Sequence, residues 1–370
     1  MEFYINTGEL LGALDMLHNI SQAKNVRPIL ANTLIDGTGD RLKITTTDLE
    51  IGMTISKTAR ITEPGRITLP TQELYKLAGK LGASNDMHFK EESNFWMTIL
   101  SGKSRFRLAG LDPEEYPEVM EVGKGAKFSI PNSLMSRLVD YTIFSVSTDI
   151  NKKVLNGIFV ESSGPGKVRM VATDGHRLGK VEALVAEGVE DKFGGVVLPS
   201  KGLKELRRIL SGREGVSEWT LGESAARIRE GEFEMTLRYI EGAFPGYQRV
   251  IPESSRIQVA FDRKELQEAL GRVSVFASDK YIGVHCEIQS GSAKIAFNNP
   301  GIGEASEEIS TDYSQETFQI SFNARYLNDL LTNLTEKRVT LEVNEAQSPC
   351  MVREMEGEIS KVYIVMPMML

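Results

Sequence analysis

The residues whose types could do chemistry together are Asp174 and His176, which lie two positions apart in the segment Thr-Asp-Gly-His. A carboxylate beside an imidazole can orient the ring as a general base, the arrangement that activates a serine or cysteine nucleophile. No nucleophile accompanies this pair, and the Gly-x-Ser-x-Gly motif occurs nowhere in the chain. We therefore interpret Asp174 and Gly175 as a hairpin turn, with His176 packing or hydrogen bonding beside it.

One segment has some features of a phosphate-binding loop. SGPGKV (163–168) contains the Gly-Lys pair, but the motif also needs a glycine where Glu161 stands and a serine or threonine where Val168 stands. We interpret this segment as a plain turn.

The candidate metal ligands are scattered. The four histidines show no ligand spacing, and the two cysteines are too few for a disulfide framework and are predicted to be buried thiols. These residues are His18, His88, His176, His285, Cys286 and Cys350. The sequence predicts no metal, no cofactor and no catalytic residue.

Three hairpin patterns recur at domain spacing. Each consists of alternating apolar residues, a polar turn and a second alternating run. They are LKITTTDLEIGM (42–53), VRMVATDGHRLGKV (168–181) and AKIAFNNPGIGEAS (293–306). The turn residues Asp48, Asp174 and Asn299 are 126 and 125 residues apart, which is the size of an ordinary domain.

Other landmarks recur in the same order. Each repeat opens on a short strand followed by a helix with periodic leucines, and later has a strand, a polar cap residue and a second helix. The second pattern covers 67–81, 196–210 and 318–334. Each repeat is then predicted to close on a strand that ends at Tyr116-Pro117, Phe244-Pro245 or Met366-Pro367.

Length and composition agree with three domains. A chain of 370 residues is too long for one core, and 41% hydrophobic with 25% charged residues is typical of a soluble globular protein. We predict domains at 1–122, 126–252 and 253–370, joined at EVGKGAK and PESSR. Each is predicted to be α+β, with two helices among about eight strands and the helices on one face of antiparallel sheets.

The predicted helices are divided into apolar and basic faces. In helix 200–211 the leucines at 203, 206 and 210 face inward, while Lys201, Lys204 and Arg208 repeat beside them. Helix 72–81 has the same division, and Asp262 with Glu265 forms a capping-box pair before a third helix. For any one helix a solvated face remains the simpler interpretation.

The net charge of −8 argues against bulk attraction to nucleic acid. A net acidic protein whose basic residues are gathered on helix faces is typical of one that surrounds a polyanion without binding it tightly. The start MEFYINTGELLG has no basic region before an apolar run, and no apolar stretch approaches the roughly 20 residues of a membrane span. We therefore expect a cytoplasmic protein.

VATDGHRL (171–178), FPGYQRVIP (244–252) and the terminal YIVMPMML (363–370) together resemble the bacterial DNA polymerase III beta sliding clamp family. The resemblance runs from the opening MEFYIN to the last residue. It implies three clamp domains per chain, a head-to-tail dimeric ring around duplex DNA, and a non-catalytic processivity factor. The implied partners are the DNA polymerase III catalytic subunit, the clamp loader, and other polymerases and repair proteins with clamp-binding peptides.

The resemblance also implies three sets of site residues. A partner-peptide pocket would consist of Leu155, Thr173, Gly175, His176, Arg177, Leu178, Pro245, Arg249, Val250, Tyr326, Ile364, Val365, Met366, Pro367 and Met368. The family pattern and the basic helix faces together give the DNA-facing residues Lys24, Lys76, Lys80, Arg137, Lys152, Lys201, Lys204 and Arg208. Head-to-tail pairing would join Arg105 and Phe106 to Val275, Phe276, Glu304, Glu307 and Glu308 of the other chain.

The pocket set is a credible peptide site, since methionines can repack around different ligands. His176 and Arg177 are expected at its rim. The family commonly has a basic residue before the final leucine, where this chain has the uncharged Met369.

Two alternatives stay open. A hydrolase using Asp174 and His176 would need a third catalytic group in only one of three matching repeats. A self-assembling cytosolic scaffold without a DNA role would form the same ring but would not be retained on circular DNA.

Overall fold

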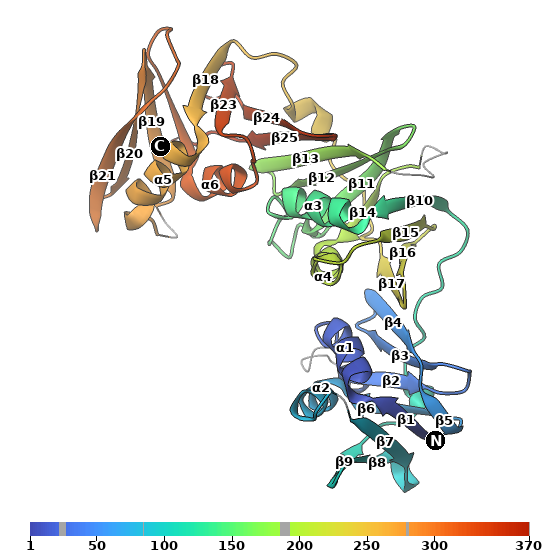
Figure 1. Cartoon of the computed structure of the whole chain (residues 1–370). Helices are drawn as coiled ribbons and strands as arrows, with labels where there is room; N and C mark the ends of the chain where they lie inside the picture. The colour runs from blue at the N-terminus through green and yellow to red at the C-terminus, as the bar shows by residue number, and fades with distance from the viewer. Residues whose placement is uncertain (22–26, 84, 186–192, 279–280, 370) are drawn as a thin grey trace. The chain divides into compact units, whose positions relative to one another are not determined.

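The structure is a computed structural model that describes residues 1–21, 27–83, 85–185, 193–278 and 281–369 (Figure 1). Internal contacts divide the chain into two compact units, which are described separately. The described residues of the first unit are 1–21, 27–83, 85–136 and 201–239. Those of the second are 137–185, 193–200, 240–278 and 281–369.

The first unit contains two sheets. The five-stranded sheet has the order β5 (Arg60–Glu63), β1 (Glu2–Asn6), β7 (Asp86–Glu91), β8 (Trp96–Ser101) and β9 (Ser104–Ala109). The eight-stranded sheet has the order β10 (Ala126–Pro131), β15 (Val216–Leu221), β16 (Ala225–Glu230), β17 (Phe233–Arg238), β4 (Ile51–Lys57), β3 (Leu42–Thr47), β2 (Asn32–Asp36) and β6 (Arg66–Pro70).

The second unit repeats this plan. Its eight-stranded sheet has the order β14 (Val196–Pro199), β11 (Gly157–Gly164), β12 (Lys167–Thr173), β13 (Arg177–Leu184), β25 (Ile359–Val365), β24 (Cys350–Glu356), β23 (Arg338–Val343) and β18 (Ile257–Asp262). Its four-stranded sheet has the order β21 (Gly303–Ser310), β20 (Ser292–Asn299), β19 (Gly283–Gln289) and β22 (Phe318–Asn323).

Six α-helices lie in the described residues, two in each predicted domain. They are α1 (Thr7–Leu17), α2 (Thr71–Lys80), α3 (Asn132–Ile143), α4 (Ser200–Leu210), α5 (Arg263–Val273) and α6 (Ala324–Thr332). Within the units α1 lies against α2 and α5 against α6 (Figure 1). The α+β plan with antiparallel sheets and two helices per domain is confirmed.

Apolar periodicity explains how the helices pack. In α4, Leu203, Leu206 and Leu210 are fully buried, as the spacing of three and four predicts. Both thiols, Cys286 and Cys350, are buried and free, as predicted, and burial raises the pKa of Cys286 to about 12.

The three hairpins are present where the sequence predicts them. In each, the side chain of the polar turn residue accepts hydrogen bonds from backbone N–H groups of the same turn. One carboxylate oxygen of Asp48 accepts the backbone N–H groups of residues 50 and 51, and Asp174 does the same for residues 176 and 177. Asn299 accepts from the N–H of Gly301. Side chains that accept local backbone bonds favour such turns.

Pairing between repeats makes the long sheets continuous. In the first unit β4 pairs with β17, so a strand of the first repeat lies beside one of the second. In the second unit β13 pairs with β25, so the second repeat is joined to the third in the same way. Two of the four sheets are therefore built from adjacent repeats.

The predicted strand ends at Tyr116-Pro117 and Phe244-Pro245 are wrong. β9 ends at Ala109 and β17 at Arg238, and only β25 ends directly before Met366-Pro367. The two aromatic residues instead anchor connecting segments. The Tyr116 hydroxyl donates toward the carbonyls of Asn32 and Thr45, both at 3.2 Å, and accepts from Thr47 N–H, also at 3.2 Å.

The predicted polar cap of the second helix is confirmed for α6, where Asn323 accepts from the N–H groups of residues 325 and 326. In α2 the cap position is held by Pro70, and Thr71 is already helical. The capping prediction at Asp262 is confirmed for its own side chain, which accepts from residues 264 and 265.

Candidate partner-binding site and basic helix faces

The pairing of β13 with β25 brings two of the three predicted peptide-site motifs side by side. Arg177 stands opposite Val365 and Leu178 opposite Ile364. The chain then continues past the strand, and Met366 N–H donates to the carbonyl of His176 at 2.8 Å. Residues almost 190 positions apart thus form one surface.

An apolar cluster forms the floor beneath this surface. It contains the buried side chains Val171, Leu178, Tyr247, Met351, Val362 and Ile364, with Phe159, Phe244, Ile251 and Met366 packed against it. Leu178 and Ile364 are almost fully buried, whereas Met366, Pro367 and Met368 are half-buried. The accessible apolar wall is therefore the segment after β25, which we call the tail (366–369).

The tail is fixed at two points. Besides the bond from Met366, the N–H of Met368 donates to the carbonyl of Ser321 at 2.8 Å. Met369 is 87% exposed, so it contributes little to the wall. These two bonds join the tail to the β12–β13 turn and to β22.

A buried charge cluster fixes β25 itself. Lys361 is fully buried, and its Nζ lies 2.7 Å from Glu354 and 2.6 Å from Glu356. The Tyr141 hydroxyl donates to Glu356 at 2.7 Å. Since a buried ammonium requires paired acceptors, this cluster favours one register for the strand that leads into the tail.

Arg177 lies beneath the surface rather than at its rim. Its side chain is 9% exposed, with Nε 3.0 Å from Asp174 and Nη1 2.6 Å from Asp329. Its guanidinium lies over the ring of Tyr326, 4.4 Å from the centroid. The rim expectation for Arg177 is wrong because two carboxylates and an aromatic ring draw the guanidinium inward.

His176 is exposed, as expected for a rim residue, and its ring centroid is 6.4 Å from that of Tyr326. Thr173 is half-buried and its hydroxyl donates to the carbonyl of Arg177 at 2.6 Å. Gly175 has φ +95°, which glycine adopts without strain. The turn therefore presents His176 above the Tyr326 ring.

The third predicted motif, FPGYQRVIP (244–252), contacts the apolar cluster through its two aromatic side chains. Phe244 stacks on Phe159 with ring centroids 4.8 Å apart, and the Tyr247 hydroxyl lies 2.5 Å from Glu161. Burial raises the pKa of Tyr247 to about 12. Both aromatic residues belong to the apolar floor, and Pro245, Arg249 and Val250 are exposed on the same segment.

Leu155 is half-buried, and its carbonyl accepts from Ser147 N–H at 2.9 Å. It lies in the 3-10 turn that precedes β11.

The predicted DNA-facing residues divide into two classes. Lys76, Lys80 and Lys204 are exposed, whereas Lys24 lies outside the described residues. The others have acceptors within the chain. Lys201 lies 2.5 Å from Asp48, Arg208 2.9 Å from Glu205, Arg137 2.6 Å from Glu356, and Lys152 donates to the Asp174 carbonyl at 3.3 Å.

The third helix pair carries exposed cations that are not in the predicted DNA-facing set. Arg325 on α6 and Lys264 on α5 have side chains 83% and 82% exposed. Lys264 is in the first turn of α5, which the repeat aligns with α3 and whose basic residues are visible in the sequence. Arg325 is in the first turn of α6, which the repeat aligns with α4, and this alignment could have identified it. Because they are so exposed, their intrahelical ion pairs contribute little.

Five of the seven predicted contact residues between chains lie on the outer strands of sheets, and Val275 and Phe276 lie in the 3-10 turn after α5. Arg105 and Phe106 are on β9, and the three glutamates are on β21; each strand ends the order of its sheet. Val275 is 72% exposed, and Phe276 is half-buried against Gly303. Glu307 is held by Arg272 at 2.6 Å, a bond that lowers the pKa of the glutamate.

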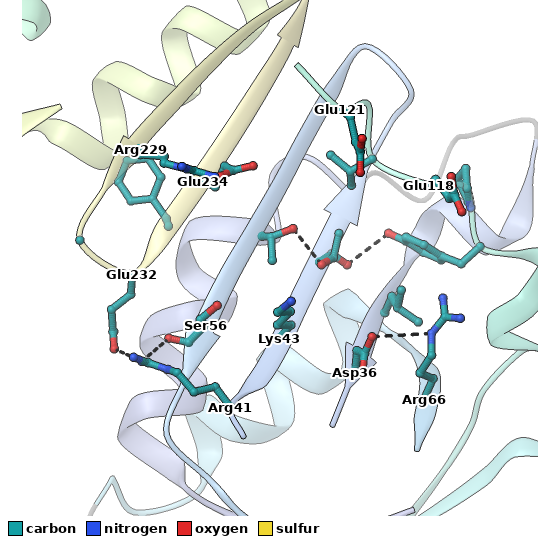
Figure 2. A pocket seen from close by; sticks show the side chains of 18 residues that line it. Asp36, Arg41, Lys43, Ser56, Arg66, Glu118, Glu121, Arg229, Glu232 and Glu234 are labelled. Carbon is teal, nitrogen blue, oxygen red and sulfur yellow. Dashed lines mark hydrogen bonds and ion pairs between the residues drawn. The ribbon is translucent and has the colours of Figure 1, made fainter. Parts of the chain in front are cut away.

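A separate hollow lies over the eight-stranded sheet of the first unit, with a volume of about 780 Å³ (Figure 2). Its lining is strongly charged. Figure 2 shows Arg41 meeting Glu232, at 2.7 Å, and Arg66 facing Asp36, at 3.8 Å. Because these charges pair with one another, the hollow is unlike the apolar surface beside the tail. It contains none of the predicted site residues.

Within the described residues, no group of three or more histidine, cysteine, aspartate or glutamate side chains could hold a metal ion. Among those same residues, no helix is both long enough and apolar enough to cross a membrane.

Comparison with known proteins matches the whole chain. Models of the DNA polymerase III beta subunit match residues 1–120 (N-terminal domain), 129–246 (central domain) and 248–369 (C-terminal domain). The beta sliding clamp of Pseudomonas aeruginosa is 33% identical over 375 residues, and that of Escherichia coli K12 is 29% identical over 372; both alignments cover each chain fully.

Solved structures agree. The DNA polymerase III subunit beta of Pseudomonas aeruginosa superimposes with a TM-score of 0.94 at 32% identity, and the sliding clamp of Bartonella birtlesii bound to griselimycin with 0.94 at 31%. Each covers the whole of both chains.

Proposed function

The chain belongs to the DNA polymerase III beta subunit family, the bacterial sliding clamps, and from that membership we propose which of its surfaces carry the function. Its function is that of a DNA sliding clamp, a non-catalytic processivity subunit of three clamp domains. We propose domain boundaries at 1–122, 126–252 and 253–370, near the limits of the three matching models.

We propose that two chains close head to tail into a ring around duplex DNA. A few cations that contact phosphate give modest, sequence-independent and salt-sensitive affinity. A closed ring cannot leave sideways, so it slides and keeps its partners at high effective concentration near the DNA. The observation that carries this proposal is the pairing of β4 with β17 and of β13 with β25, because it lets sheets run from one repeat into the next.

The experiment that tests the ring is loading onto nicked circular DNA with a clamp loader and ATP, followed by linearisation. Loaded protein should stay on the circle through a high-salt wash and run off once the DNA is cut. Equal retention on linear DNA with free ends would contradict sliding. A ring that is never retained on the circle would favour the scaffold without a DNA role.

We propose the cations on the helix faces as the DNA-facing set: Lys24, Lys76, Lys80, Arg137, Lys152, Lys201, Lys204 and Arg208. Lys204 is the strongest candidate of α4 because it is exposed and has no ion pair among the described side chains. Lys201 and Arg208 would have to exchange Asp48 and Glu205 for phosphate.

Replacing Lys201, Lys204 and Arg208 together with alanine is expected to weaken salt-sensitive contact with duplex while leaving the protein folded. The three leucines that pack α4 are untouched, and each lost phosphate contact lowers the slope of log affinity against log salt by about 0.9. Equilibrium binding to a short duplex at several salt concentrations measures this slope. The matched control replaces Lys43 and Lys127, which are exposed on strands, and should leave the slope unchanged.

We propose the tail surface as the site for partner peptides, with the fifteen residues named for it above. Support comes from the accessible apolar tail, the buried apolar floor and the exposed His176 above the Tyr326 ring. Met366 and Met368 can repack around different apolar side chains. The partners would be the polymerase catalytic subunit, the clamp loader, and other polymerases and repair proteins.

We propose the chain-to-chain contact between β9 of one protomer and β21 of its partner. Both are sheet-edge strands, whose free backbone groups can pair with another chain. Phe106, Val275 and Phe276 would form an apolar centre, with Arg105 facing Glu304, Glu307 and Glu308. We propose the cytoplasm as its location, because a replication clamp acts at the bacterial chromosome.

A further inference from the structure

Arg177 is the centre of a cluster built from three separate elements. Asp174 belongs to the turn before β13, and Asp329 and Tyr326 to α6. Phe144 follows α3, and its ring centroid is 5.6 Å from the guanidinium carbon. The guanidinium is thus held in its plane by two carboxylates and covered by aromatic rings.

The two carboxylates have different surroundings. Asp174 already accepts two backbone N–H groups of its own turn, and its side chain is 13% exposed. Asp329 is 29% exposed, and the same Oδ2 atom that accepts from Arg177 at 2.6 Å lies 4.0 Å from Arg325 Nε. Since the Arg325 side chain is 83% exposed, the short bond from Arg177 dominates.

Geometry links Asp329 to the surface of the peptide site. Asp329 and Tyr326 are one turn apart on α6, so they reach the guanidinium from the same helix. The carboxylate holds one edge of the planar guanidinium, whose central carbon lies over the Tyr326 ring, 4.4 Å from the ring centroid. The same Tyr326 ring lies near the exposed His176, with ring centroids 6.4 Å apart.

We propose that Asp329 is a positioning residue of the peptide site, which orients Tyr326 by holding Arg177 against its ring. This inference rests on the proposed peptide-binding function. Without the carboxylate, Arg177 Nη1 would be buried without a charged acceptor, and the guanidinium would turn toward Asp174 or water. Tyr326 would lose the flat cation that fixes its ring, and a peptide would have to order the ring on binding.

The first test is Asp329→Asn, which keeps the side-chain shape and removes the charge. Affinity for a fluorescein-labelled peptide from a polymerase catalytic subunit, measured by polarisation, should fall on the order of tenfold. Sedimentation should still show a dimer. Glu230→Gln is the matched control, because Glu230 also pairs with an arginine, Arg213, at 3.4 Å, but lies on β16 of the first unit, outside the peptide site. It should leave peptide affinity unchanged.

The second test distinguishes positioning from general support of the fold. Tyr326→Ala should itself weaken binding, and adding Asp329→Asn to it should cause no further loss, since the ring to be oriented is gone. Arg177→Lys should behave like Asp329→Asn, because an ammonium cannot lie flat on the ring while holding both carboxylates. An undiminished affinity in Asp329→Asn, or an equal further loss in the Tyr326→Ala background, would overturn the inference.

A variant without the tail shows whether a failed prediction concerns Asp329 or the proposed peptide site itself. If wild-type protein binds the peptide and the tail deletion abolishes binding, the peptide site stands whatever Asp329 does. If the deletion leaves binding intact, the proposed site fails first. Each outcome therefore assigns the failure to one of the two claims.

Discussion

Replacing Phe276 with Asp is expected to convert the dimer into monomers. The Phe276 ring packs against Gly303 in the β20–β21 hairpin, and the neighbouring Val275 is exposed. In the proposed interface the new carboxylate would be buried without a partner, a cost of several kcal/mol in a contact of this kind. Sedimentation at low micromolar concentration measures the change directly.

Because Phe276 also packs against its own domain, the substitution could loosen the fold, so a second variant is needed. Val275→Asp serves this purpose, since Val275 is 72% exposed and its replacement removes almost no internal packing. It should dissociate the dimer with little change in thermal unfolding of the domain.

A charge reversal tests the rim of the same interface. Arg105→Glu should weaken the dimer, and combining it with Glu304→Arg should restore part of the loss. An undisturbed dimer in all of these variants would place the interface elsewhere.

Deleting residues 366–370 is expected to abolish tight binding of partner peptides. The deletion removes the accessible apolar wall and the two backbone bonds, from Met366 to His176 and from Met368 to Ser321, that hold it. A few buried apolar anchors usually dominate such binding, so a loss of a few kcal/mol is expected, about a hundredfold or more in affinity. Calorimetry or fluorescence polarisation with a polymerase-derived peptide measures it.

Dimerisation should survive this deletion, because the proposed contacts between chains lie on β9 and β21. The strand β25 should also survive, since its pairing with β13 and β24 ends at Val365. Met369→Ala is the matched control and should bind normally, because Met369 is 87% exposed. Unchanged peptide affinity in a dimeric deleted protein would remove the tail from the site.

The sequence by itself determined the three repeats, the hairpins and the inward face of α4. These features depend on the spacing of apolar residues and on short turns, where Asp48 and Asp174 bond to backbone only two and three residues away. Apolar spacing and turn chemistry are local, so they can be read without knowing the tertiary contacts. The motifs that imply a clamp were equally visible along the chain.

The tertiary structure alone decided where the charges and the connecting segments lie. Arg177 was expected at a rim, but Asp329, 152 residues away, draws it inward, and Lys201 is held by Asp48, 153 residues away. Such partners are selected by the pairing of strands from different repeats, and no local pattern encodes that choice. The same reason applies to Tyr116 and Phe244, which resemble strand ends in the sequence. In the structure the Tyr116 hydroxyl donates to the carbonyls of Asn32 and Thr45, and the Phe244 ring stacks on Phe159.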